Sequence, residues 1–91
     1  MADGNRTLPL YDIHTAAFLE YRGIELTLTK QGTRVVFEVP TTDEAYRALA
    51  EYQTNPDIPL LDFVAVLRRL RGRMLDERDG ERRYGYGNHR P

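Results

Sequence analysis

The feature that most constrains the fold is a pair of alternating segments, residues 24–29 and 34–39, joined by a short polar link. Side chains on a β-strand point alternately to two faces, so apolar residues at every second position predict two strands with one apolar face. A two-residue turn at Gln31-Gly32 fixes the expected register of the hairpin. The pairs are then Leu28 with Val35, Leu26 with Phe37, and Ile24 with Val39. Two strands are marginal alone, so helices or another chain must cover or extend the hairpin.

Helices are expected on both sides of the hairpin. The first is predicted over residues 13–22, because Asp12 is placed as its N-cap and Gly23 as its C-terminal stop. The second is predicted over residues 42–53, after a capping box formed by Thr41 and Glu44. Asn55-Pro56-Asp57 then has the composition of a turn.

A third helix is predicted from near Pro59 to about residue 77, and it is the longest and most amphipathic. Its expected core-facing stripe is Leu60, Phe63, Val64, Leu67, Leu70 and Met74. The sequence thus predicts an α+β fold made of a helix, a two-stranded antiparallel hairpin and two helices. One compact domain is expected over residues 10–78, followed by an Arg/Tyr/Gly tail over residues 79–91, and residues 80–91 are expected to be disordered.

Composition removes several classes of protein. The 91 residues suit one domain, and they include no cysteine and no serine, so disulfides, thiolate metal sites and serine nucleophiles are excluded. The apolar runs are far shorter than a membrane span requires. The N-terminal residues lack the apolar stretch of a secretory signal, which favours a cytoplasmic location.

The net charge of −1 hides a division along the chain. Residues 1–67 contain 5 Lys or Arg and 10 Asp or Glu, whereas residues 68–91 contain 8 Arg and 4 acidic residues. Guanidinium groups bind phosphates in a bidentate manner and stack on bases, so this basic end is the candidate nucleic-acid contact. The candidate residues are Arg68, Arg69, Arg71, Arg73, Arg82, Arg83, Tyr84 and Tyr86. The alternative is a solvated helix end and a solubilising tail, in which Arg73 pairs with Glu77 at i+4.

Protein contact is the other expectation from the third helix. Leu61 and Val66 fall outside the predicted core stripe, so the helix has more apolar surface than a small sheet covers. Self-association or a protein partner would use these two residues, and an unpaired hairpin edge would offer a second route.

Catalysis is not expected. His14 is followed by Phe18 and Tyr21 on one side of its helix and is interpreted as a half-buried histidine that packs against these rings. A small enzyme that uses His14 with Tyr or Arg partners is the least favoured hypothesis. No cofactor, metal, small-molecule substrate or membrane partner is expected.

The chain resembles a family of short bacterial domains catalogued only as a domain of unknown function. The resemblance covers roughly residues 10–75 and rests on three groups of residues. These are Asp12, Ala16, Ala17, Leu19 and Gly23; Val35-Val36-Phe37; and Phe63-Val64 with Leu67-Arg68-Arg69-Leu70-Arg71. The resemblance implies a compact α/β unit and assigns no functional residue.

Two functions therefore remain in view. The first is a non-enzymatic interaction module within a larger assembly, with the arginine-rich helix and tail as a nucleic-acid contact. The second is a structural or adaptor protein that self-associates, or binds a protein partner, through the third helix or the hairpin edge.

Overall fold

The alternating segments form an antiparallel sheet with three strands, in a computed structural model that describes residues 6–79. The strands are β1 (Thr7–Leu10), β2 (Thr27–Gln31) and β3 (Arg34–Pro40), arranged in the order β1-β3-β2. The prediction of an α+β fold is confirmed, and the prediction of a two-stranded hairpin is wrong. The third strand comes from the same chain, which makes β3 central.

Strand β1 explains how the hairpin is extended. It pairs antiparallel with β3, with Leu8 opposite Val39 and Leu10 opposite Phe37. Pro9 has no backbone N–H to donate, which suits an edge strand. The Thr7 hydroxyl donates a hydrogen bond to the Glu38 carboxylate at 2.6 Å, which adds a side-chain link between the two strands. β1 begins at Thr7, before residue 10, where the compact domain was expected to begin.

The predicted hairpin register is displaced by two residues. Gln31 lies opposite Arg34 and Leu28 lies opposite Phe37, so the turn is Gly32-Thr33 rather than Gln31-Gly32. Gly32 has φ +66°, a left-handed value, as the first central residue of a type II′ turn requires. A two-residue shift keeps every side chain on its face. Leu26 and Phe37 accordingly lie together in the core, as predicted.

Three helices accompany the sheet: α1 (Ile13–Tyr21), α2 (Asp43–Tyr52) and α3 (Leu60–Arg78). Asp12 caps α1 as predicted, by accepting hydrogen bonds from the backbone N–H groups of His14 and Thr15. Thr42, and not Thr41, caps α2, because its hydroxyl accepts from the N–H of Ala45 at 3.1 Å.

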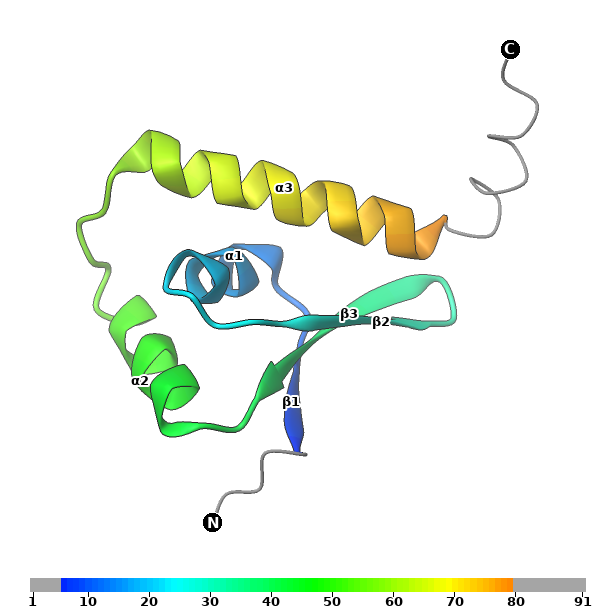
Figure 1. Cartoon of the computed structure of the whole chain (residues 1–91), viewed down its shortest axis with the longest axis horizontal. Helices are drawn as coiled ribbons and strands as arrows, with labels where there is room; N and C mark the ends of the chain where they lie inside the picture. The colour runs from blue at the N-terminus through cyan, green and yellow to red at the C-terminus, as the bar shows by residue number, and fades with distance from the viewer. Residues whose placement is uncertain (1–5, 80–91) are drawn as a thin grey trace.

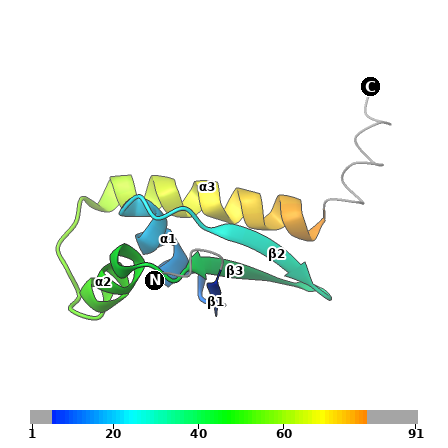
Figure 2. The same cartoon turned by 60° about the horizontal axis from the view of Figure 1, so that its bottom comes forward.

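Helix α1 is the central element of the helical layer. It contacts both α2 and α3, and Figures 1 and 2 show it between them. Ala16, Ala17, Phe18 and Leu19 are each at most 1% exposed, because α1 is enclosed by the sheet and by both other helices. Ala16 and Ala17 are small enough to let the neighbouring elements pack closely against α1. Phe37 of β3 and Leu70 of α3 belong to the same core.

Helix α3 runs along the sheet beside β2, as Figure 1 shows, and its last turns lie near the β2-β3 turn. The residues that it packs against the core are Phe63, Val66, Leu67, Leu70 and Met74. The predicted stripe was partly wrong: Leu60 is 69% exposed, and Val66 takes a core-facing place instead of Leu60 and Val64. Among residues 6–79, no helix is long and apolar enough to cross a membrane.

Candidate nucleic-acid interface

Three arginines of α3 face solvent. Arg68, Arg69 and Arg71 are all exposed, and none forms an ion pair with another residue in the described part of the chain. At about 100° per residue, all three lie on the half of the helix turned away from the buried Leu70. We call these three residues the arginine face.

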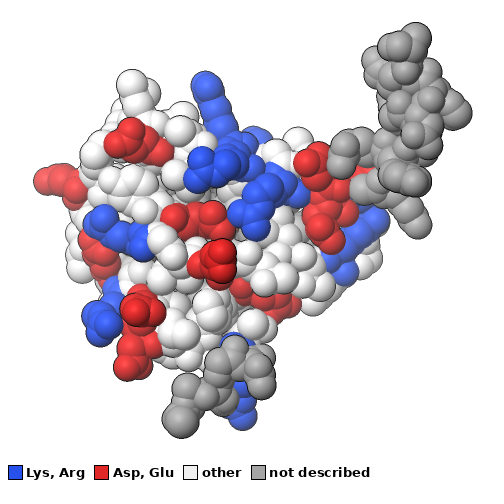
Figure 3. Space-filling model, in the orientation of Figure 1, with Lys and Arg blue, Asp and Glu red and all other residues white. Residues whose placement is uncertain are grey.

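The charges around this face are arranged along the helix axis. Asp62 lies in the first turn of α3, the arginines lie in the middle, and Asp76 and Glu77 follow near the end. Figure 3 shows basic side chains gathered over the middle of α3, with acidic side chains on either side. The acidic flanks confine any strong attraction for anions to the central turns.

Arg73 was predicted to belong to the same surface, and the structure gives it a different contact. Its guanidinium donates to the carboxylate of Glu20 at 3.1 Å and to the backbone carbonyl of Leu26 at 3.3 Å. The Glu20 carboxylate also accepts from the N–H of Leu26, at 3.4 Å. Arg73 therefore joins α3 to α1 and to the chain entering β2. The expected pairing with Glu77 is replaced by this Glu20–Arg73–Leu26 contact.

The Glu20–Arg73–Leu26 contact satisfies both backbone groups of Leu26 just before β2 begins. Leu26 is 5% exposed, and the side chain of Glu20 is 14% exposed, so the contact is partly removed from water. Buried backbone groups need hydrogen-bond partners, and here two side chains supply them. Arg73 is consequently a structural residue.

The two residues predicted for protein contact differ in exposure. Leu61 is 77% exposed, next to the exposed Leu60, so it is available to a partner. Val66 is half-buried against the core, and the prediction that it lies outside the core-facing stripe is wrong. Arg82, Arg83, Tyr84 and Tyr86 lie outside the described residues, as does the predicted disorder of residues 80–91.

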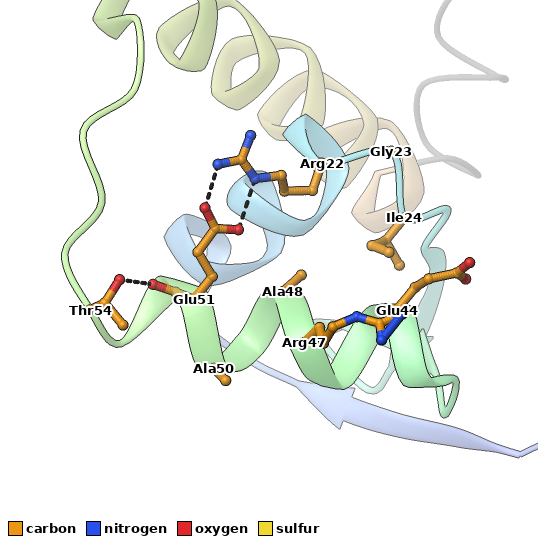
Figure 4. Close-up of a pocket in the computed structure, with 9 residues that line it drawn as sticks. All are labelled: Arg22, Gly23, Ile24, Glu44, Arg47, Ala48, Ala50, Glu51 and Thr54. Atoms are coloured by element: carbon orange, nitrogen blue, oxygen red, sulfur yellow. Dashed lines mark hydrogen bonds and ion pairs between the residues drawn. The ribbon is translucent and has the colours of Figure 1, made fainter.

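A hollow of about 750 Å³ lies between α2 and the chain that follows α1 (Figure 4). Arg22 and Glu51 meet on one side of it in a bidentate pair, with nitrogen–oxygen distances of 2.9 and 2.5 Å. Arg22 also stacks on the rings of Phe18 and Tyr21. The guanidinium lowers the pKa of the Glu51 carboxyl by hydrogen bonding to its charged form. This pair joins α1 to α2, and its charges are used within the fold.

A smaller cleft of about 470 Å³ lies where α2 leads into α3. Phe18, Tyr52 and Phe63 supply aromatic rings, and Pro56 and Ile58 extend the apolar lining. His14, Gln53 and Asn55 add polar groups. Asn55 has φ +56°, a left-handed value that asparagine tolerates, and it turns the chain at the end of α2. The sequence did not indicate this cleft, because its lining combines His14 and Phe18 of α1 with residues 52–63, which lie far along the chain from them.

His14 differs from its predicted environment. It was expected to be half-buried, but its side chain is 58% exposed and its Nδ1 lies 3.3 Å from the carboxylate of Asp12. The pKa of Asp12 is lowered, mainly because the Thr15 hydroxyl donates to its carboxylate at 2.6 Å, with further hydrogen bonds from His14 and the Thr15 backbone. Asp12 therefore acts as a helix cap and orients His14. Among residues 6–79, no cluster of His, Asp and Glu is suited to hold a metal ion.

The chain matches a known family. Residues 5–76 match the family described as Domain of unknown function (DUF5659). The chain belongs to this family. The DUF5659 match spans β1 to the last turns of α3 and includes the arginine face and the cleft, and the resemblance predicted over residues 10–75 is thereby confirmed. No curated protein and no solved structure gives a significant match to the chain.

Proposed function

We propose that the protein is a non-enzymatic interaction module that contacts the phosphate backbone of a nucleic acid through the arginine face of α3. The observation that carries the proposal is that Arg68, Arg69 and Arg71 are exposed together and form no ion pair within residues 6–79. Arg22 and Arg73, by contrast, are bonded to carboxylates that hold the fold together. A cytoplasmic location would give the module access to such a partner.

Phosphate is the anion that this arrangement suits best. A guanidinium group can donate two parallel hydrogen bonds to phosphate oxygens, and it stays charged at any physiological pH. Residues one turn apart on a helix, such as Arg68 and Arg71, lie about 5–6 Å apart at Cβ, so their long side chains can reach neighbouring phosphates. No base-reading pattern is evident on the arginine face, so we expect binding with little sequence preference.

The test is binding of labelled oligonucleotides over a salt series. Three phosphate contacts on a DNA duplex give a slope of about −2.7 in log affinity against log salt. Affinity should then fall about 40-fold between 50 and 200 mM salt through the arginine face alone. Changing Arg68, Arg69 and Arg71 together to Gln should remove that component. Arg73 is left unchanged because its loss would disturb the fold.

A matched control removes three charges elsewhere on the surface. Lys30, Arg34 and Arg47 are also exposed and lie outside α3, so changing them to Gln alters the net charge by the same amount. If the two triple variants lose affinity equally, general charge attraction explains the binding and the arginine face does not. Absence of binding by the intact chain at low salt would contradict the nucleic-acid proposal altogether and favour the adaptor alternative.

Residues 80–91 supply a second, smaller expected contribution, through Arg82, Arg83, Tyr84 and Tyr86. Deleting these residues should weaken binding less than the α3 variant does, because the arginines of α3 are held in place by a packed helix. A site that is already held in place loses little conformational entropy on binding. A larger effect of the deletion would transfer the proposed site from α3 to the tail.

A further inference from the structure

We propose that the cleft between α1, α2 and α3 binds the C-terminal segment of a second copy of the chain, with Tyr84 as the inserted side chain. The cleft is lined by the rings of Phe18, Tyr52 and Phe63, and its volume of about 470 Å³ is within the range of pockets that enclose small ligands. An aromatic ring is the side chain that such a lining accommodates best, because offset and edge-to-face ring contacts add to the burial of apolar area.

The polar groups of the cleft favour tyrosine over phenylalanine. His14, Gln53 and Asn55 line it beside the aromatic rings. Each carries a hydrogen-bonding group that a phenol hydroxyl can use as donor or acceptor. A tyrosine inserted from the open side would thus keep its hydroxyl paired while its ring is buried.

The charges next to the cleft are acidic. Asp57 is exposed and lies between the lining residues Pro56 and Ile58, and the exposed Asp62 directly precedes the lining residue Phe63. Asp12 is hydrogen-bonded to the lining residue His14. Arg22, which stacks on Phe18, is already paired with Glu51. A ligand with positive charges beside its aromatic ring is therefore complementary to this site.

The chain itself contains a segment with this chemistry. Tyr84 directly follows Arg82 and Arg83, and Gly85 after it leaves the backbone unhindered for close approach. A tyrosine would enter the cleft, and the two arginines would lie near Asp57 and Asp62. The charge complementarity thus identifies the occupant as residues 82–86.

The length of the chain after α3 favours an occupant from another molecule. α3 separates Phe63 from Asp79 by 16 residues, or about 24 Å of helix. Tyr84 follows Asp79 by five residues, which span at most about 17 Å when fully extended. Figure 1 shows the start and the end of α3 at opposite ends of the molecule. Tyr84 could approach its own cleft only if all five residues ran fully extended straight back along α3, so the favoured occupant is the segment of a neighbouring copy, which gives head-to-tail association.

The direct test uses a fluorescein-labelled peptide of residues 80–91 and the full-length chain carrying Tyr84→Ala, which cannot compete through its own tail. Saturable binding is expected. A peptide with Tyr84→Ala should bind at least about tenfold more weakly, because the central aromatic residue of an interface supplies much of the affinity. No binding at protein concentrations up to about 1 mM, the weak end of specific affinities, or equal binding of the two peptides, would overturn the proposal.

Charge exchange locates the peptide on the protein. Asp57→Lys should weaken binding of the natural peptide, and a peptide with Arg83→Glu should recover affinity for that variant. Glu25→Lys is the matched control, since Glu25 is also exposed and lies before β2, outside the cleft lining. A loss with Glu25→Lys equal to that with Asp57→Lys would show non-specific attraction and refute the assignment.

Self-association of the full chain is the second measurement. Sedimentation velocity should show an average mass that rises with concentration for the natural chain and stays monomeric for Tyr84→Ala. A natural chain that remains monomeric up to about 1 mM, or an assembly that persists in Tyr84→Ala, would contradict the proposal. The variant of the arginine face should retain peptide binding, so failure of the nucleic-acid proposal and failure of this one are distinguishable.

Discussion

Replacing Arg73 by Met should destabilise the fold, whereas the same change at Arg69 should not. Methionine preserves most of the side-chain length and apolar packing and removes the hydrogen bonds. The loss comprises the bond from Arg73 to Glu20 at 3.1 Å and the bond to the carbonyl of Leu26 at 3.3 Å. Glu20 would keep only the N–H of Leu26 as a partner, at 3.4 Å.

The magnitude follows from the exposure of the two side chains. A fully exposed pair would contribute less than about 1 kcal/mol, and loss of a partner from a fully buried charge would cost about 3–5 kcal/mol. Glu20 is 14% exposed but Arg73 is 42% exposed, so solvent screening places the contact nearer the lower figure. We expect a loss of about 1–2 kcal/mol, a substantial part of the stability of a small domain.

Urea unfolding measures this loss directly. The free energy of unfolding of a domain this small falls by about 1 kcal/mol per molar urea, so the urea concentration at the unfolding midpoint should fall by about 1–2 M for Arg73→Met. Arg69→Met, on the exposed face of the same helix, should stay within about 0.5 kcal/mol of the natural chain. Combining Glu20→Gln with Arg73→Met should cost less than the sum of the two single changes, because they remove one shared contact. Equal stability of Arg73→Met and Arg69→Met would refute the structural assignment of Arg73.

Four further changes test the fold. Phe37→Ala removes a side chain that is 1% exposed and should cost about 3–5 kcal/mol in thermal or urea unfolding, so near-natural stability would contradict its core position. Asp12→Ala should cost about 1 kcal/mol at neutral pH through the lost cap. Because the pKa of Asp12 is lowered in the folded state, its contribution is complete above about pH 4 and is lost below it, so the difference between variant and natural chain should shrink in acid. An added Cβ meets nothing within 4 Å at Gly32 or Gly72, so only the backbone conformation distinguishes the two sites. Gly32→Ala should reduce the free energy of unfolding by about 1–2 kcal/mol because of φ +66°, whereas Gly72→Ala should raise it by up to about 1 kcal/mol through better helix propensity. The reverse order of stability would contradict the turn assignment.

The hairpin shows which part of the sheet was predictable. Alternation fixes the sheet face on which each side chain lies. A turn at Gln31-Gly32 and a turn at Gly32-Thr33 give pairings that differ by two residues, so each side chain lies on the same face in both. The choice between them depends on which residue adopts a left-handed conformation, and Gly32 does so. β1 gave too weak a signal, since it has four residues and one of them is Pro9.

The surface of α3 was less predictable than its existence. Apolar residues occur around much of its circumference, including Leu60 and Leu61, so the pattern alone does not select the buried side. α1 and the sheet make that selection, and they turn Val66 inward. Arg68, Arg69 and Arg71 proved exposed as expected, but the partner of Arg73 lies 53 residues earlier in the chain. Helical spacing contains no information about a contact of that kind.

The central place of β3 in the sheet has a consequence for synthesis of the chain. β1 is made first, yet its partner ends at Pro40, about 30 residues later, so at 5–20 residues per second β1 waits roughly 2–6 s on the ribosome for a strand to pair with. The three strands emerge from the ribosome before α3 does, so the core side of Phe37 then lacks its contact with α3. While the residues that follow β3 still lie inside the ribosomal exit tunnel, the nascent sheet would therefore have an apolar face open to aggregation and to chaperones.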